Sequence, residues 1–425
     1  MTNQSRPKVV IVGAGFGGLT AAKKLATAPV DVIVIDRRNH HLFQPLLYQV
    51  ATAGLSPADI AAPIRGVLSD QKNVTVILGE VIGVDAEKQK VAINSGTHTD
   101  EVSYDYLILA TGARHAYFGN DAWEKFAPGL KTIEDATAIR HRLLIAFERA
   151  EMASDPAELK RLLTIVVIGG GPTGVEMAGT IAELARAALA KDFRHIDPRK
   201  THILLVEAGP KLLASFPDDL SAAARKSLEQ LDVEVRVDAR VTACDSDGVV
   251  IGDQRISAGT IIWAAGVQAS PAASWLNAEA DKAQRVKVRP DFSVAEHDNV
   301  FVIGDTSVLT DAAGKVVPGV APAAKQAGGY VAGVIRARLS KRSAPKPFTY
   351  KNYGNLATIG RRAAVVDFGW IKLHGPIAWW LWGAAHIFFL IDFRSRIAVT
   401  FNWMWSFITY KRGARLITDV RPDHS

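Results

Sequence analysis

Residues 9–36 read VVIVGAGFGGLTAAKKLATAPVDVIVID. Apolar, β-branched residues run directly into the glycines of a G-x-G-x-x-G motif, Gly13, Gly15 and Gly18. A helical pattern follows the motif, and a second apolar run closes on Asp36. Because strand, helix, second strand and terminal acid all fall at the expected spacing, the stretch predicts a βαβ unit that binds a dinucleotide. The alternative is a glycine-rich turn that matches by chance.

Each glycine of this motif meets a separate steric demand. Gly13 permits the tight turn from strand to helix, Gly15 lets a pyrophosphate approach the backbone, and Gly18 lets the helix pack on the strand. The unpaired N–H groups at the helix N-terminus attract the phosphates. Asp36 lies where a carboxylate would accept hydrogen bonds from a ribose. The motif therefore predicts a nucleotide held by backbone amides and one acid.

The chain carries a second copy of this plan. A strand pattern leads into Gly169, Gly171 and Gly174, and a later strand pattern ends on Glu207. The second copy is longer because it contains the polar, basic segment 191–200, which we expect to be a surface insertion. Two copies argue against a chance match and predict two nucleotide sites.

Further strand patterns extend the repeat. Residues 104–113 read YDYLILATGA, and residues 260–267 read TIIWAAGV at the matching place in the second copy. After that copy, residues 300–305 form a strand pattern that ends on Asp305 and can rejoin the first domain. We therefore expect the second domain to be an insertion in the first.

The composition limits the class of protein. At 425 residues, 48% hydrophobic and 22% charged, the chain is expected to form two or three globular domains. Cys244 is the single cysteine, so no internal disulfide and no C-x-x-C redox pair exists.

His40 and His41 lack partners at ligand spacing, which favours a solvated loop, and no metal site is predicted. Residues 57–68 have a helical pattern.

The C-terminal part differs in character from the rest. Residues 375–391 read GPIAWWLWGAAHIFFLI, and six of the nine tryptophans lie between Trp370 and Trp405. The longest apolar run is shorter than the roughly 20 residues that span a bilayer. Cations such as Arg394 and Arg415 flank the pattern, and tryptophan-rich helices of this kind lie in the membrane interface. We expect helices that bind an anionic membrane surface. The alternatives are a buried helix or a dimer interface.

The motifs taken together resemble one group of flavoproteins. The order G-A-G-F-G-G, A-T-G-A, G-G-G-P-T-G-V-E and V-I-G-D resembles the two-dinucleotide-binding-domain flavoproteins over nearly the whole chain. The resemblance implies FAD in the first site and a nicotinamide dinucleotide, which reduces the flavin, in the second. Glu207 has no neighbouring arginine and would repel a 2′-phosphate, which favours NADH over NADPH. In this family the acid that matches Glu176 lies near the nicotinamide and flavin rings. The alternative is an acid favoured by the helix dipole.

The electron acceptor follows partly by exclusion. Disulfide reductases of this fold need a cysteine pair, so a quinone, a small electron-transfer protein and oxygen remain. Residues 43–54, residues 318–328 and the tryptophan-rich tail resemble the type II NADH:quinone oxidoreductases. That family often shows A-Q-x-A-x-Q, whereas this chain has Pro322 in place of the first glutamine. The resemblance implies a quinone contact at Gln326, with Lys325 as a second candidate.

The resemblance assigns the sites residue by residue. The catalytic candidates are Glu176, Gln326 and Lys325. The residues expected at FAD are Gly13, Gly15, Phe16, Gly17, Gly18, Asp36, Arg37, Val81, Thr111, Gly112, Asp305 and Ala321. The residues expected at NADH are Gly169, Gly171, Gly174, Glu176, Glu207 and Gly266.

The predicted fold is α/β, with two Rossmann-like dinucleotide-binding domains, the second inserted in the first. We expect a discontinuous FAD-binding domain at 1–115 and 290–345, and an NADH-binding domain at 116–289. Residues 346–425 are expected to form a membrane-anchoring region with amphipathic helices.

The expected activity is that of a single-subunit respiratory enzyme. Hydride passes from NADH to FAD, and two electrons then pass to a membrane quinone, ubiquinone or menaquinone, without proton pumping. The expected location is peripheral, on the cytoplasmic face of the inner (plasma) membrane. A homodimer remains an alternative to a monomer, and no nucleic-acid partner is expected. Two alternatives remain: a soluble NADH-dependent reductase of a ferredoxin or rubredoxin, and a non-catalytic NADH-sensing flavoprotein.

Overall fold

The chain folds into two compact units, which are described separately. The computed structural model describes residues 6–96, 98–343, 345–409 and 412–417. Unit 1 comprises Met1–Leu42, Ala62–Arg114 and Val267–Tyr353, and unit 2 comprises Phe43–Ala61, His115–Gly266 and Gly354–Ser425.

Unit 1 is built on a mainly parallel sheet with the strand order β20-β21-β9-β1-β2-β5. The central strand β1 (Lys8–Val12) pairs in parallel with β2 (Asp31–Asp36) and with β9 (Tyr106–Leu109). The strand β21 (His297–Val302) lies parallel to β9, so the chain returns to this sheet after the second repeat. Residues 9–12 are fully buried, because both faces of the sheet are covered.

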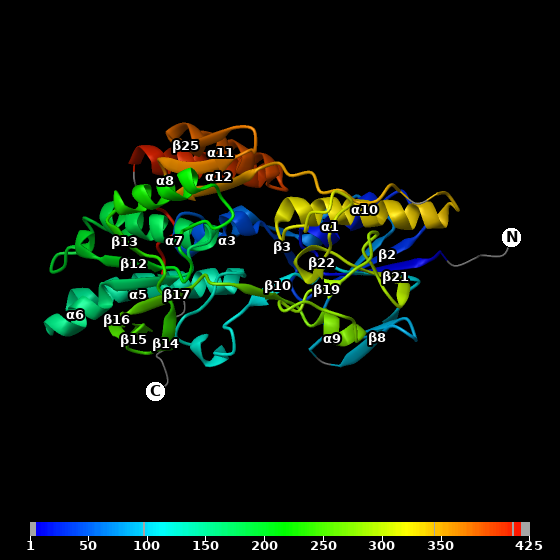
Figure 1. Cartoon of the computed structure of the whole chain (residues 1–425), viewed down its shortest axis with the longest axis horizontal. Helices are drawn as coiled ribbons and strands as arrows, with labels where there is room; N and C mark the ends of the chain where they lie inside the picture. Colours follow the sequence, from blue (N-terminus) through cyan, green and yellow to red (C-terminus); the bar gives the residue numbers. More distant parts are fainter. Residues whose placement is uncertain (1–5, 97, 344, 410–411, 418–425) are drawn as a thin grey trace. The chain divides into compact units, whose positions relative to one another are not determined.

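Two helices cover one face of this sheet. The helices α1 (Phe16–Lys24) and α10 (Ala321–Leu339) lie side by side in Figure 1. They approach closely, because a Cβ atom added to Gly328 would lie 2.2 Å from the carbonyl oxygen of Gly17. On the other face, the small sheet β6–β7–β8 and the helix α9 (Ala272–Leu276) pack into the core.

The other elements with residues in unit 1 are short. They are β3 (His40–Leu42), β4 (Ala61–Pro63), α4 (Ile64–Val67), β5 (Val74–Leu78), β6 (Glu80–Asp85), β7 (Lys90–Asn94), β8 (Thr99–Ser103), β10 (Ala113–His115), β18 (Val267–Ala269), β19 (Val286–Lys287), β20 (Ser293–Val294), η5 (Gly304–Thr306) and β22 (Ser307–Val308).

The helix expected over residues 57–68 is wrong. The chain forms α3 (Pro57–Ile60), then a short extended segment, then α4. Pro63 explains the break, because proline disfavours the helical conformation of the residue before it and has no N–H to donate. The apolar spacing was helical, but the proline divides it.

Unit 2 repeats the plan of unit 1. Its parallel sheet has the order β13-β12-β11-β17, with β11 (Thr164–Ile168) between β12 (His202–Val206) and β17 (Thr260–Trp263). The helix α7 (Pro172–Glu183) packs on this sheet. The antiparallel sheet β14–β15–β16 shares a core cluster with strands β11, β12 and β17, as β6–β8 does with the sheet of unit 1.

The C-terminal elements also belong to unit 2. An antiparallel sheet of β23 (Asn355–Ile359), β24 (Ala363–Asp367) and β25 (Lys372–Gly375) leads into α11 (Pro376–Phe389) and α12 (Phe393–Thr409). Figure 1 shows them in orange and red, next to α7 and α8. Among the residues that the structure describes, none of the helices combines the length and the apolar character that a membrane span requires.

The remaining elements of unit 2 connect these parts. They are η1 (Gln44–Leu46), α2 (Leu47–Ala51), η2 (Asp121–Trp123), α5 (Ile133–Met152), α6 (Pro156–Leu162), the π-helical turn η3 (Leu184–Ala188), η4 (Pro198–Lys200), α8 (Asp218–Glu229), β13 (Val233–Arg236), β14 (Val241–Asp245), β15 (Gly248–Ile251) and β16 (Gln254–Ser257).

These two units do not coincide with the three predicted domains. The tail and residues 43–61 fold together with the second nucleotide-binding plan. The predicted division by function, into FAD, NADH and membrane regions, stays a prediction, and residues 1–5 and 418–425 of it lie outside the described residues.

Candidate dinucleotide sites

The first glycine turn leaves an open anion site at the start of α1. Gly15 is the N-cap of this helix, no side chain caps it, and no acid lies in its first turn. The space beside this helix N-terminus is open, since a Cβ atom added to Gly15 would meet no atom within 4 Å, and a helix N-terminus attracts anions. By contrast, a Cβ atom at Gly18 would lie 1.9 Å from the carbonyl oxygen of Gly13.

The acid at the end of β2 closes this turn. One carboxylate oxygen of Asp36 accepts a hydrogen bond of 2.6 Å from the N–H of Ala14, and the other accepts one of 2.8 Å from the N–H of Arg38. Arg37 is exposed beside it. The carboxylate thus lies at the glycine turn, where a ribose hydroxyl could replace a backbone donor.

The second turn reproduces this geometry in unit 2. Gly171 is the uncapped N-cap of α7, with open space around its Cβ position. A Cβ atom at Gly174 would lie 1.8 Å from the carbonyl oxygen of Gly169. The carboxylate of Glu207 accepts hydrogen bonds of 2.6 Å from the N–H groups of Gly170 and Gly209. Both turns therefore fit a dinucleotide, with a helix N-terminus for the phosphates and a carboxylate for a ribose.

Hydroxyl groups gather in unit 1 at the carboxyl ends of β9 and β21. The Oγ1 atom of Thr111 lies 2.5 Å from Oγ of Ser270 and 3.3 Å from Oγ1 of Thr306. The hydroxyl of Thr306 donates to the carbonyl oxygen of Gly112 at 3.1 Å. Asp305 precedes this group at the strand end. Ligands of open α/β sheets bind at this edge, so these positions fit the predicted flavin site.

The beginning of α10 brings three candidates into unit 1. Ala321 is its first residue, and the Nζ atom of Lys325 lies 5.3 Å from the ring centroid of Phe16. The side-chain amide of Gln326 is engaged with Lys351: its Nε2 donates to the backbone carbonyl at 2.9 Å and its Oε1 accepts from the backbone N–H at 2.9 Å. Gln326 therefore fixes the segment that leads into the C-terminal elements.

Two other predicted positions differ from the glycine turns in their surroundings. The side chain of Val81 packs in the hydrophobic core of unit 1, so the backbone of this residue is the part that a ligand could contact. Gly266 has a φ of +97°, and a Cβ atom there would lie 2.5 Å from the ring of Phe118. Only glycine fits this position.

The expectation of a solvated loop is wrong for His41. This side chain is 2% exposed, and its Nδ1 donates to the carbonyl oxygen of Ala14 at 2.8 Å. Burial lowers the pKa of His41 to about 4, so the ring is neutral at pH 7. Its Nε2 is buried and has no hydrogen-bond partner among the described residues, which suits a donor group of a bound nucleotide. The strand β3 reads His-His-Leu, which shows no alternation of polar and apolar residues, so the sequence gives no local signal of this burial.

No group of three or more metal-ligating side chains occurs among the residues that the structure describes. Cys244 is buried in the core of unit 2, and burial raises the pKa of its thiol to about 11. The thiol is therefore protonated at neutral pH and poorly suited to redox chemistry.

Glu176 is a buried acid on α7. It is 9% exposed, and its Oε1 accepts a long hydrogen bond of 3.5 Å from the N–H of Thr358 on β23. Burial raises the pKa of Glu176 to about 8, so its carboxyl group holds a proton at pH 7. A dipole-stabilised carboxylate would instead be ionised and exposed, so the burial favours a chemical role.

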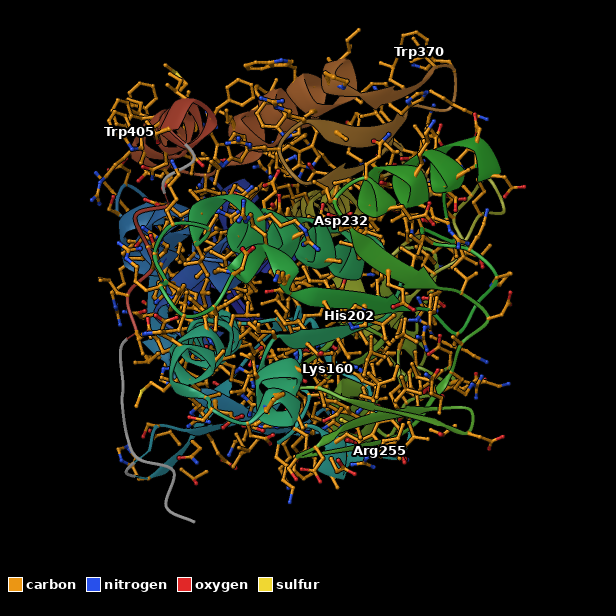
Figure 2. The ribbon with its side chains drawn as sticks, turned by 90° about the vertical axis from the view of Figure 1, so that its left-hand side faces the viewer. Lys160, His202, Asp232, Arg255, Trp370 and Trp405 are labelled. Carbon is orange, nitrogen blue, oxygen red and sulfur yellow. The ribbon has the colours of Figure 1, made fainter. Side chains whose placement is uncertain are left out.

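Aromatic side chains are exposed on the tail of unit 2. Trp380 on α11 is 64% exposed and Trp405 on α12 is 54% exposed. Figure 2 shows Trp370 and Trp405 on one side of the unit and Arg255 on the opposite side. Other large apolar residues exposed on these elements are Ile377, Leu381, Phe388, Phe389, Phe393, Ile397, Phe401, Met404, Phe407 and Ile408. Such a concentration of exposed apolar groups marks an interaction surface.

Comparison with known proteins supplies the family. The model described as pyridine nucleotide-disulphide oxidoreductase matches residues 7–328, and the model described as the NDH2 C-terminal domain matches residues 353–411. The type II NADH:quinone oxidoreductase Ndh of Mycobacterium tuberculosis is 45% identical over 97% of this chain and 91% of its own length. The chain belongs to the type II NADH:quinone oxidoreductases.

Further type II relatives agree with this assignment. A second M. tuberculosis enzyme, NdhA, is 46% identical over 97% of this chain and 90% of its own length. The structure of NDH2 from Plasmodium falciparum in complex with NADH has a TM-score of 0.89 at 21% identity, and covers 97% of this chain and 100% of that one. At this identity the structural likeness supports the fold. The family resemblance predicted from the motifs and the α/β fold class are confirmed.

Proposed function

We propose that this chain is a single-subunit enzyme that oxidises NADH and reduces a quinone through bound FAD, without proton pumping. The observation that carries the proposal is the duplicated glycine turn, one copy in each unit of a chain that belongs to the type II NADH:quinone oxidoreductases. Two nucleotide sites on one chain suit a flavin and the nicotinamide that reduces it. Unit 1 would hold FAD and unit 2 would hold NADH.

The chain's own residues would bind and orient the two nucleotides. Bound FAD accepts a hydride and passes two electrons on. In unit 1, the amides of α1 would hold the pyrophosphate and Asp36 a ribose, with Asp305 at the far strand end. In unit 2, the amides of α7 and the carboxylate of Glu207 would do the same for NADH. Glu207 would repel the 2′-phosphate of NADPH.

Glu176, Gln326 and Lys325 are the residues that we assign to the quinone step. Because burial keeps Glu176 protonated at neutral pH, it can supply a proton that quinone reduction requires. Gln326 retains one amide hydrogen and one lone pair beyond its two bonds to Lys351. It could therefore contact a quinone carbonyl while it holds the backbone in place. Lys325 would contribute positive charge beside Phe16.

We further propose that the enzyme is a peripheral membrane protein that binds through α11 and α12. The exposed tryptophans and phenylalanines of these helices would enter the headgroup region, as amphipathic interfacial helices do. Quinones are apolar, so this placement brings the acceptor to the enzyme. The cytoplasmic face and a homodimer also remain proposals.

The test of the function is a steady-state assay of the purified protein in mild detergent. With a short-chain quinone, we expect NADH oxidation that depends on both FAD and quinone, and much slower oxidation of NADPH. With a ferredoxin or rubredoxin in place of the quinone, we expect little turnover. Faster turnover with the protein acceptor than with quinone would contradict the proposal.

A further inference from the structure

Unit 2 contains a cavity that the proposed function does not yet use. Its volume is about 70 Å³, which is enough for at least two water molecules. Hydroxyl groups line it, from Tyr48 on α2, Thr180 on α7 and Thr358 on β23. The lining also contains Glu183, at the C-terminal end of α7.

Glu183 and Glu176 lie on the same side of α7. They are seven residues apart, which is about two helical turns, or roughly 10 Å along the axis. Thr180 lies between them, and its hydroxyl donates to the carbonyl oxygen of Glu176 at 2.6 Å. Thr358, which also lines the cavity, donates its N–H to the carboxyl group of Glu176. The cavity therefore reaches from one acid to the immediate surroundings of the other.

Tyr48 lines the same cavity as Glu183. It is 2% exposed, and burial together with the charges of Glu176 and Glu183 raises the pKa of its hydroxyl well above the usual value. This hydroxyl accepts a hydrogen bond of 2.9 Å from Nε2 of Gln49 and keeps its own hydrogen to donate. It can therefore pass a proton by accepting one and donating another.

Glu183 is the outer of the two acids. Its side chain is 15% exposed, and it pairs with Arg412 at 3.3 Å. Its Oε1 also accepts a hydrogen bond of 2.7 Å from the N–H of Arg361. Three positively charged groups face Glu183: Arg412 from the C-terminal segment, and Arg361 and Arg362 from the turn after β23. Burial raises the pKa of Glu183, and these cations only partly offset that effect.

The backbone around Glu183 is shaped to hold it there. The π-helical turn η3 begins directly after Glu183, and π-turns often mark functional positions. Gly360, with a φ of +64°, packs against the carboxylate, because a Cβ atom there would lie 2.6 Å from Oε1. The acid is thus held in the cavity wall by these contacts, with its side chain still 15% exposed.

We propose that this cavity conducts a proton from solvent at Glu183 to Glu176, through water and the hydroxyl of Tyr48. The proposal rests on the proposed function, in which NADH, one proton and a quinone give NAD⁺ and a quinol. Hydride transfer supplies two electrons and one hydrogen, so one further proton must come from water in each turnover. The route delivers that proton to Glu176, and no electron moves along it.

The test is Glu183→Gln, studied anaerobically by rapid mixing. Wild-type protein first establishes the two half-reactions, so that a failure of the proposed function is seen independently. In the variant, we expect NADH to bleach the flavin at the wild-type rate and quinone to restore the colour at least tenfold more slowly. Added formate or imidazole should recover part of that rate, because small weak acids can enter and replace the missing relay. The control is Glu229→Gln on α8, which removes an exposed carboxylate from an ion pair with Arg225.

A second variant leaves both acids in place. Ala187→Leu would fill the cavity, since Ala187 is one of its lining residues. We expect this variant also to slow only the quinone step. The solvent deuterium isotope effect on that step should be larger than in wild type. An unchanged quinone step in both folded variants would overturn the proposal. So would a slower step that neither weak acids nor deuterium affects, because Glu183 would then only clamp Arg412.

Discussion

Gly15 and Gly18 share one turn, but a methyl group added at each has a different consequence. At Gly18 it would overlap the carbonyl oxygen of Gly13, whereas at Gly15 it would enter open space. We expect Gly18→Ala to lower the free energy of unfolding by about 3 kcal/mol or more. Gly15→Ala should fold normally but lose bound FAD, because the methyl group would occupy the position that we propose for the phosphate. Urea unfolding and flavin content of the two proteins measure this, and equal effects of both changes on stability would contradict the assigned geometry.

Glu176 makes the stability of the enzyme depend on pH. Its pKa is raised from 4.5 to about 8 in the folded state, so folding favours the protonated acid. The stabilising contribution is complete below pH about 4.5 and is lost as the pH rises toward 8. The side chain of Glu176→Gln cannot ionise. We therefore expect the free energy of unfolding of this variant to exceed that of wild type increasingly as the pH rises, by on the order of 4 kcal/mol near pH 8. Denaturant unfolding between pH 5 and 9 measures the difference, and parallel pH curves would exclude a buried protonated acid.

Glu207 should determine the choice between NADH and NADPH. Its carboxylate lies at the second glycine turn, where we propose that it binds the ribose of NADH. In Glu207→Gln we expect the KM for NADH to rise about tenfold, or about 1.4 kcal/mol, and the discrimination against NADPH to fall. Glu234→Gln is the matched control, because Glu234 lies on the adjacent strand and pairs with His202 and Arg236. A loss of NADH affinity without any change toward NADPH would contradict the charge argument.

At the scale of elements, periodicity and glycine spacing were sufficient for the two nucleotide-binding plans. Strands that run into a glycine turn have few alternative structures, so both copies could be read from the sequence. The helix expected over 57–68 failed because one proline overrode its pattern. The burial of His41 and the bonds of Gln326 to Lys351 depend on residues distant in sequence, and no local pattern reveals them. For the same reason the cavity beside Glu183, built from five separate segments, was not predictable.

The helices α11 and α12 carry the prediction for membrane binding. We expect the double change Trp380→Ser and Trp405→Ser to reduce co-sedimentation with anionic lipid vesicles by about tenfold or more, because two exposed indole groups leave the interface. Met152→Ser is the control, since Met152 is 85% exposed on α5, outside the tail. Unchanged binding of the double variant would exclude this surface as the membrane contact.

At the scale of the whole molecule, the central claim is that two nucleotide-binding units on one chain perform two half-reactions in sequence. The direct measurement follows the flavin absorbance under anaerobic conditions, with NADH added first and a short-chain quinone second. The account predicts bleaching by NADH and rapid recovery of the colour with quinone. Bleaching without recovery would contradict the claim that a quinone is the acceptor, and absence of bleaching would contradict the assignment of FAD and NADH to the two units.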